Sequence, residues 1–188
     1  TSGALKTVAV SLSKIANDIR WLGSGPRAGL GELILPAVQP GSSIMPGKTN
    51  PVICEAMIQG CAQVIGNDMA ITIGGQGGVF ELNLMLPLIA HNLTNSITIL
   101  SNSTNIFTEK LITSLKPNKE KCAGYIEGSL AMCTSLVPVI GYDKAANIAY
   151  KAFNSGKTVR EIALEENVLD KNKLNEILDP VSMTKPSQ

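Results

Sequence analysis

The chain has 188 residues, of which 44% are hydrophobic and 16% charged, and its formal net charge is +1 at pH 7. This length fits one domain with a core of its own, or one domain with a small appendage. The small net charge argues against a nucleic-acid or anionic-membrane partner, because phosphate binding needs clustered Lys and Arg side chains. A composition with this many hydrophobic and this few charged residues favours helices that are buried on all sides, as when several subunits share one core.

The first part of the chain is predicted to be helical and then irregular. In residues 4–22, apolar side chains recur every three or four positions, which indicates a helix with one buried stripe. Residues 24–39 are rich in glycine and proline, and only 30–35 are expected to form a short extended piece. Arg20 and Arg27 flank this change, where they are suited either to stabilise an anion or to pair with carboxylates.

The loop at residues 41–51 reads GSSIMPGKTNP and carries the most chemistry in the chain. Its two glycines allow backbone amides to approach a ligand, and its two prolines limit how far the loop moves. Hydroxyl groups and the cation Lys48 in such a setting are what an anion-handling active site needs. From the residues alone, an ordinary connection between two helices remains the alternative.

A second helix is predicted to begin at Asn50 and Pro51, with a capping side chain followed by proline at the first helical position. Glu55 lies in its first turn, where a carboxylate complements the helix dipole. The glycines of 74–78 should end it, and no Gly-Lys-Ser/Thr follows them to indicate a phosphate loop. A long helical pattern then covers 79–115. At about 1.5 Å per residue it approaches roughly 50 Å and needs neighbours from partner subunits.

Shorter helices are predicted after residue 117. Asn118 is expected to cap a helix that extends to about residue 136, and a further helix should cover 143–156. Thr158 and Glu161 have the spacing of a capping box, and Asp170 is suited to cap the last helix. We therefore expect two domains, 1–117 and 118–188. The helix-turn-helix appearance of the second does not favour DNA binding, because acidic residues offset its lysines.

The cysteines and the histidine do not indicate a metal site. No CxxC pairing or metal-type spacing connects them, so the thiols are more typical of small buried side chains in a reducing compartment. No segment is predicted to span a membrane, since glycines and polar residues interrupt the most apolar stretch, 71–90. The four cysteines considered for a metal site are Cys54, Cys61, Cys122 and Cys133, and the histidine is His91.

The loop GSSIMPGKTNP closely resembles the signature loop of the fumarase/aspartase superfamily. The segments KIANDIRWLGSGPRAGLGELILP, GNDMAITIGGQGGVFELNLMLP and IGYDKAANIA are similar to class II fumarases, so the resemblance covers nearly the whole chain. It implies an all-α fold, with a long-helix bundle followed by a small C-terminal helical domain. The family's N-terminal half has no counterpart here, and we expect the chain to be a C-terminal fragment.

The resemblance implies reversible hydration of fumarate to L-malate, a step of the tricarboxylic acid cycle, with no metal or organic cofactor. Loss of a proton beside a carboxylate creates an aci-carboxylate, and catalysis must stabilise its extra charge. Ser42 corresponds to the catalytic base, and Glu55 to a glutamate that orients the groups around the second acid/base. The positions that correspond to substrate-binding residues are Ser43, Lys48, Thr49 and Asn50.

The same resemblance implies a homotetramer in which three subunits build each active site. The family's catalytic histidine lies on a segment without a counterpart here, and His91 is expected to be a packed or surface residue. The chain alone is therefore expected to be inactive, with the cytoplasm as its default compartment and the mitochondrial matrix as the other option. The alternatives are an aspartase acting through the same loop and a helical oligomerisation module without chemistry, as in the related lens crystallins.

Overall fold

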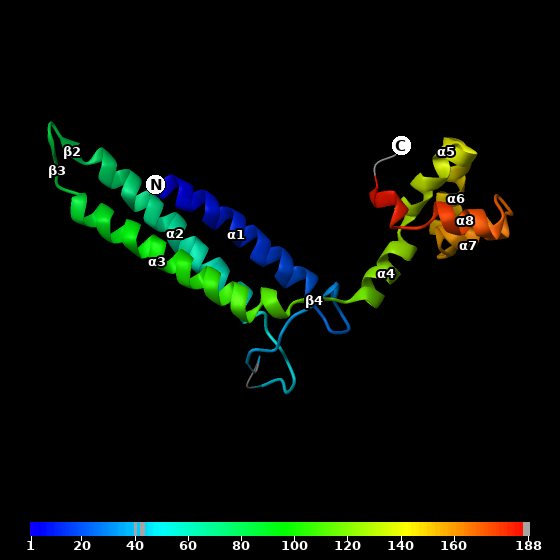
Figure 1. Ribbon diagram of the computed structural model, residues 1–188, viewed down its shortest axis with the longest axis horizontal. Coiled ribbons are helices and arrows are strands. Elements are labelled where there is room, and N and C mark those ends of the chain that lie inside the picture. The colour runs from blue at the N-terminus through cyan, green and yellow to red at the C-terminus, as the bar shows by residue number, and fades with distance from the viewer. Residues whose placement is uncertain (40, 42–43, 186–188) are drawn as a thin grey trace. The chain divides into compact units, whose positions relative to one another are not determined.

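The computed structural model describes residues 1–39, 41 and 44–185, and its architecture is all-α apart from two small antiparallel ladders. This confirms the predicted fold class. The chain divides into two compact units, Thr1–Asn118 and Lys119–Gln188 (Figure 1). Within the described residues, no single helix is both long and apolar enough to cross a membrane. The bent pair Lys119–Gly128 and Leu130–Ile140 meets those criteria only when its members are taken together.

The first unit consists of three long helices that lie side by side (Figure 1). The predicted first helix is present, and α2 lies between α1 and α3 and packs against both. A short ladder ties the segment after α1 to the end of the unit, because β1 pairs with β4 in antiparallel register. The elements are α1 (Ser2–Leu22), β1 (Leu33–Ile34), α2 (Val52–Gln76), β2 (Gly78–Val79), β3 (Leu82–Asn83), α3 (Leu86–Lys110), η1 (Ile112–Ser114) and β4 (Lys116–Pro117).

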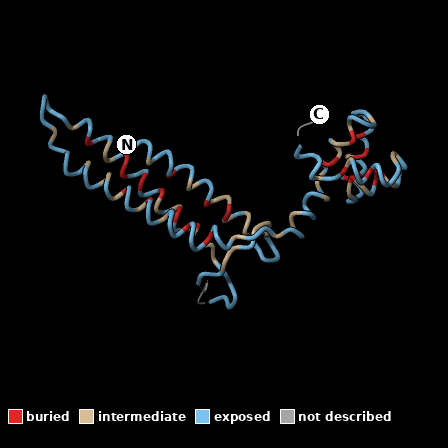
Figure 2. Tube along the Cα trace, in the orientation of Figure 1, coloured by how far each residue is buried: buried red, intermediate tan, exposed pale blue. Residues whose placement is uncertain are grey.

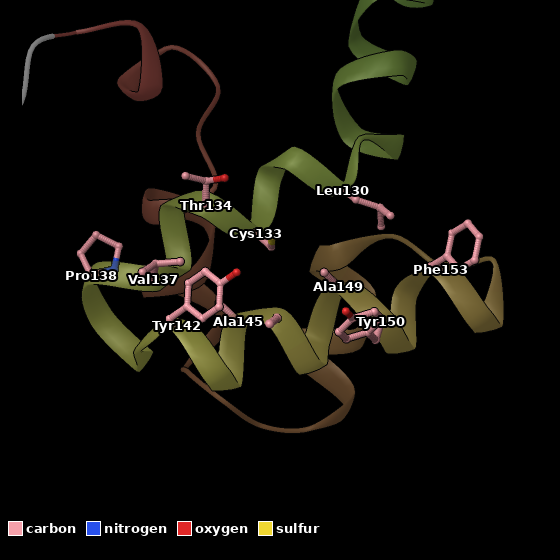
Figure 3. Close-up of a pocket in the computed structure, with 11 residues that line it drawn as sticks. Leu130, Cys133, Thr134, Val137, Pro138, Tyr142, Ala145, Ala149, Tyr150 and Phe153 are labelled. Carbon is pink, nitrogen blue, oxygen red and sulfur yellow. The ribbon is translucent and has the colours of Figure 1, made fainter.

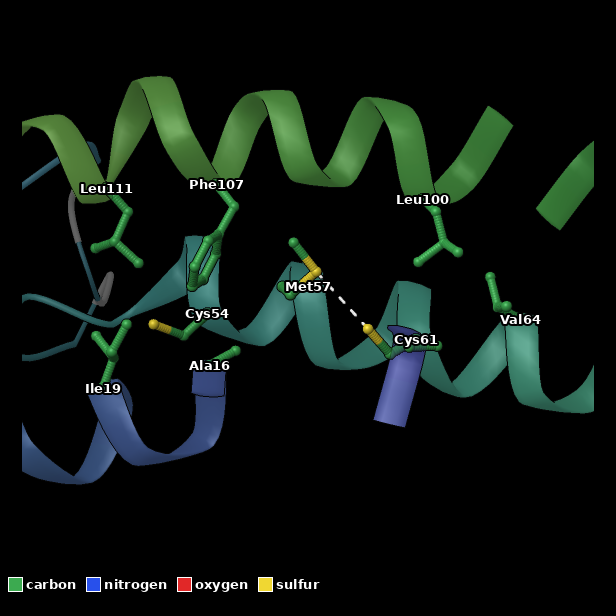
Figure 4. Close-up of a cluster of buried hydrophobic side chains, with 10 residues drawn as sticks. Ala16, Ile19, Cys54, Met57, Cys61, Val64, Leu100, Phe107 and Leu111 are labelled. Atoms are coloured by element: carbon green, nitrogen blue, oxygen red, sulfur yellow. Dashed lines mark hydrogen bonds between the residues drawn. The ribbon is translucent and has the colours of Figure 1, made fainter. Parts of the chain in front are cut away.

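The core of this unit is one narrow line of buried side chains between the helices (Figure 2). Several of its members are small, so the helix backbones approach closely, while Met57 and Phe107 fill the remaining space (Figure 4). The thiol of Cys61 donates to the sulfur of Met57 at 3.7 Å. The buried members are Ala9, Ala16, Ile19, Cys54, Met57, Cys61, Val64, Leu100, Phe107 and Leu111.

A polar network crosses the same unit and connects all three helices. Asp68 on α2 accepts from the Ser2 hydroxyl at 2.6 Å and pairs with the Lys6 ammonium at 2.6 Å. The neighbouring Asn67 donates to the hydroxyl of Ser96 on α3 at 3.1 Å. These hydrogen bonds, from Lys6 first and Ser2 second, lower the pKa of Asp68. Because a buried polar group is costly without a partner, the network favours one register of the three helices.

The long helix predicted for 79–115 begins later than expected, at Leu86. A hairpin formed by β2 and β3 precedes it, and α2 extends through Gly74 and Gly75 to Gln76. Asn83 explains the difference, because its side chain donates to the carbonyl of Gly74 at 3.0 Å and accepts from the backbone N–H of Met85 at 2.7 Å. One side chain thus satisfies backbone groups at the end of α2 and just before α3.

The second unit is made of short helices around a core of its own. The helix predicted up to residue 136 is divided, because Ser129 accepts from the backbone N–H of Ala131 and starts a 3₁₀ helix there. The capping box of Thr158 and Glu161 is confirmed, and so is the Asp170 cap. The elements are α4 (Lys119–Gly128), η2 (Leu130–Leu136), α5 (Val137–Ile140), α6 (Tyr142–Ser155), α7 (Val159–Glu165), α8 (Lys171–Ile177) and η3 (Ser182–Thr184).

Candidate functional site

The described part of the signature loop borders a hollow of about 400 Å³ in the first unit. One side of it comes from the segment before the loop, at Ala37, Val38 and Gln39. The other side comes from the loop itself, where Lys48 and Thr49 are exposed. A cation and a hydroxyl therefore lie together on a surface recess of a size that holds a small anion.

Backbone hydrogen bonds shape this loop around Gly41. The N–H of Gly41 donates to the carbonyl of Lys48 at 2.8 Å, and the N–H of Lys48 donates to the carbonyl of Met45 at 3.3 Å. Gly47 has φ +78°, a left-handed conformation that glycine adopts without steric cost. The turn at 45–48 thus brings the Lys48 end of the loop back to its beginning.

Asn50 does not cap α2, contrary to the prediction. The N-cap is Pro51, which makes no side-chain capping hydrogen bond, and the helix begins at Val52. The carboxamide of Asn50 donates to the carbonyl of Gly41 at 2.7 Å instead. The loop closes tightly enough to place that carbonyl within reach of Asn50, and this contact has no local sequence signal.

Glu55 lies half-buried in the first turn of α2, as expected from the sequence. The neighbouring Cys54 is fully buried, and burial raises the pKa of its thiol to about 11, with the charge of Arg20 lowering it and that of Glu55 raising it. Cys54 is therefore a protonated thiol near neutral pH and a poor nucleophile. Arg20 on the last turn of α1 lies near enough to contribute to the electrostatics of this helix start.

The predicted catalytic base Ser42 and its neighbour Ser43 lie outside the described residues. Of the other predicted site residues, the structure places Lys48, Thr49 and Asn50 on one loop, next to the first turn of α2 that carries Glu55. His91 is exposed on α3 and does not line the hollow. Among the residues that the structure describes, no three His, Cys, Asp or Glu side chains form a group able to hold a metal ion.

A larger cavity of about 740 Å³ lies in the second unit, between η2, α5 and α6 (Figure 3). Its lining is mostly apolar and includes Leu130, Val137, Tyr142, Tyr150 and Phe153. The three aromatic side chains project from α6 toward solvent. Their spacing along one helix was visible in the sequence, but it did not distinguish a cavity lining from a core stripe. No predicted catalytic residue borders this cavity.

Comparison with known proteins identifies the family. Residues 1–66 match the family model described as lyase, and residues 132–185 match the one described as fumarase C C-terminus. A class II fumarate hydratase from Thermosynechococcus vestitus is 57% identical over 164 residues, which cover 87% of this chain and 35% of that relative. The chain belongs to the fumarase/aspartase superfamily.

Other members of the superfamily show how broad the similarity is. An aspartate ammonia-lyase from Bacillus sp is 48% identical over 185 residues, covering 98% of this chain and 40% of that relative. The crystal structure of a class II fumarase from Schistosoma mansoni superposes with a TM-score of 0.90 at 42% identity, over 100% of this chain and 39% of that one. The chain thus spans between 35% and 40% of the length of these relatives.

Proposed function

We propose that this chain forms part of an enzyme that reversibly hydrates fumarate to L-malate, and that it supplies the serine-bearing loop of the active site. The observation that carries the proposal is the hollow beside Lys48 and Thr49 on a loop closed through Gly41. Its cation and hydroxyl suit a carboxylate, and several relatives are named fumarate hydratases. The substrate class is therefore a four-carbon dicarboxylate.

In the dehydration direction, the alkoxide of Ser42 removes a proton from the carbon beside one carboxylate of malate. The electron pair moves into that carboxylate and forms an aci-carboxylate, whose extra negative charge the ammonium of Lys48 and the loop amides stabilise. The hydroxyl on the neighbouring carbon then leaves as water, taking a proton from a second acid outside this chain. Fumarate results, and hydration follows the same steps in reverse. Thr49, Ser43 and Asn50 contact the substrate.

Assembly into a homotetramer with shared active sites is part of the proposal. Apolar side chains remain exposed on the outer faces of the long helices, in positions where other subunits can cover them. Because the second acid/base lies outside this chain, we propose that the 188 residues alone do not hydrate fumarate. The cytoplasm is the proposed compartment, with the mitochondrial matrix as the alternative, since one relative is a mitochondrial fumarate hydratase. Exposed examples are Val8, Ile15, Ile65, Met69, Ile73 and Ile97.

Two substitutions in the assembled enzyme test the proposal. Ser42→Ala removes the base, and we expect kcat for malate dehydration to fall by about 10²–10⁴-fold. Lys48→Ala removes a charge that stabilises the intermediate, with an expected loss of about 10²–10³-fold. Lys144→Ala, an exposed lysine of α6, is the matched control and should keep full turnover. Unchanged kcat in Ser42→Ala with an intact tetramer contradicts the assignment.

The similarity to an aspartate ammonia-lyase supports a second candidate, elimination of ammonia from aspartate through the same loop. Comparing the turnover of malate with that of aspartate by the assembled enzyme separates the two. A stable tetramer that converts neither substrate favours the remaining alternative, a helical oligomerisation module. The motifs around the hairpin of β2 and β3 and at the start of α6, read as fumarase-like in the sequence, favour malate.

A further inference from the structure

Two ends of the signature loop meet at one residue, Gly41. Its N–H donates to the carbonyl of Lys48 at 2.8 Å, and its own carbonyl accepts from the carboxamide of Asn50 at 2.7 Å. Both backbone polar groups of Gly41 are therefore bound by residues from the far end of the loop. We refer to these two hydrogen bonds, which join Gly41 to Lys48 and Asn50, as the clasp.

The clasp requires a residue without a side chain at position 41. A Cβ added to Gly41 would lie 2.7 Å from the backbone nitrogen of Asn50 and nearer still to the carbonyl oxygen of Lys48. Both are backbone atoms from the other end of the loop, so a Cβ at position 41 fits only if the hydrogen bonds of the clasp break. The close approach of these backbone atoms is what demands glycine at position 41.

We propose that the clasp holds the backbone of Lys48 beside Gly41, and that Gly41 and Asn50 are positioning residues of the reaction. The inference rests on the proposed function, in which Ser42, the next residue in the chain, is the base and Lys48 stabilises the charge. A carboxamide has two N–H groups. Asn50 donates one N–H group to the carbonyl of Gly41, so its role in shaping the loop is separate from the substrate contact that the resemblance implies.

The proposed reaction explains why the clasp matters. Proton removal and charge stabilisation occur at adjacent atoms of one small substrate, so the base and the cation must be held at a fixed separation. Lys48 and Ser42 stand six residues apart on a loop with two glycines, and a chain of that length has many conformations. Hydrogen bonds that join position 41 to positions 48 and 50 remove most of those conformations before substrate binds.

Hydrogen exchange in the substrate-free assembled enzyme tests the clasp directly. Asn50→Ala removes the donor to the Gly41 carbonyl, and we expect the amide of Gly41 to exchange about five- to tenfold faster, as befits the loss of one hydrogen bond. Exchange in α8, which lies in the other unit, is the internal reference and should not change. If Asn50 acts only on substrate, the Gly41 amide exchanges at the same rate in both proteins, and the clasp is overturned.

Steady-state kinetics give a readout that loop stability alone does not. Gly41→Ala forces the clasp open without altering a side chain of the site, and we expect kcat to fall at least tenfold, by more than KM rises. Gly124→Ala is the matched control, because nothing lies within 4 Å of a Cβ added to that glycine of α4. Normal kcat in Gly41→Ala overturns the positioning role. If Gly41→Ala does not assemble, hydrogen exchange in Asn50→Ala decides instead: faster exchange of the Gly41 amide supports the clasp, and an unchanged rate overturns it.

The two proposals fail in different ways. An unaltered assembled enzyme that hydrates no fumarate defeats the proposed function. A fully active enzyme in which Asn50→Ala leaves the exchange of Gly41 unchanged defeats the clasp alone.

Discussion

The two units of the chain bury their apolar side chains in different ways. The second unit surrounds its core with short helices, several of which begin at a local signal such as the Thr158 capping box or the Asp170 cap. The first unit buries one line of residues between three long helices and leaves apolar side chains on their outer faces. The short helices bury their apolar side chains within their own unit, whereas the exposed apolar side chains on the long helices need further contacts to be buried.

A further contrast lies in how each unit uses polar groups. In the second unit, the guanidinium of Arg160 donates to Glu127 at 2.7 Å and to the carbonyl of Leu178 at 3.1 Å, at the rim of the core. In the first unit, Asn67 and Asp68 are buried within the bundle and bind partners on the two neighbouring helices. Polar contacts thus join the ends of helices in the second unit and align neighbouring helices in the first.

The strongest test of this comparison is a cavity in the second unit. Leu174 is fully buried there, so Leu174→Ala should lower the free energy of unfolding by about 2–5 kcal/mol. Urea unfolding followed by circular dichroism measures the loss, and hydrogen exchange shows where it occurs. Amides of α8 should exchange faster while those of α2 keep their rates, because the two cores are separate. Val139→Ala, at a side chain that is 44% exposed, is the control. Equal acceleration in α2 would contradict the separation.

A smaller effect is expected at the polar network of the first unit. Asp68→Asn removes a carboxylate that binds Lys6 and Ser2, and it should cost about 1.5–3 kcal/mol at neutral pH. Asp18→Asn is the matched control, because Asp18 forms an exposed pair with Lys14 and should cost less than about 1 kcal/mol. Urea unfolding of both variants measures the difference. A cost as small as that of the control would show that the network contributes little.

The same network predicts a dependence on pH. The hydrogen bonds from Lys6 and Ser2 lower the pKa of Asp68 in the folded state, so the folded state favours the ionised carboxylate. Its contribution is fully present above the ordinary aspartate pKa of about 3.9, and it is lost as the pH falls through the lowered pKa. The stability difference between the unaltered chain and Asp68→Asn should therefore shrink below about pH 4. A difference that stays constant in acid would contradict this assignment.

The smallest effect is expected at the hairpin between α2 and α3. Phe80 is 98% exposed and has φ +50°, so Phe80→Gly should leave the stability of this chain unchanged or raise it by about 1 kcal/mol. Phe107→Ala provides the contrast, since that ring is 5% exposed and its loss should cost about 3–5 kcal/mol. Thermal unfolding of both variants checks the prediction. A large loss at Phe80 would show that the hairpin is held by packing beyond the contacts of this chain.

The sequence predicted the helical fold class and two of the caps, because those features depend on residues close together in the chain. The capping box at Thr158 and the Asp170 cap are examples. It misplaced the start of α3, because Asn83 bonds backbone groups on both sides of the hairpin, and no periodicity shows that. For the same reason Asn50 was read as a helix cap, although its carboxamide binds Gly41 nine residues earlier.

In the candidate site, too, the features set by neighbouring residues were predictable, and those set by residues far apart in the chain were not. The loop was recognised from eleven consecutive residues, GSSIMPGKTNP, which placed Lys48 and Thr49 together. The hollow beside them also needs residues 37–39, and their approach to the loop depends on the path of the chain between α1 and α2. That path is set by tertiary contacts such as the pairing of β1 with β4, which joins residues more than 80 positions apart.

The buried pair Asn67 and Asp68 has a consequence at a distance. α2 begins beside the loop and carries this pair about 25 Å further along its axis, at a rise of about 1.5 Å per residue. If α1 slipped by one residue against α2, the partners Ser2 and Lys6 would turn by about 100° away from Asp68. The Asp68 carboxylate therefore fixes the register of α1 against α2. Residues 37–39 follow α1, and Lys48 and Thr49 precede α2, and both groups line the hollow, so a slip of α1 against α2 would be expected to change the distance between them.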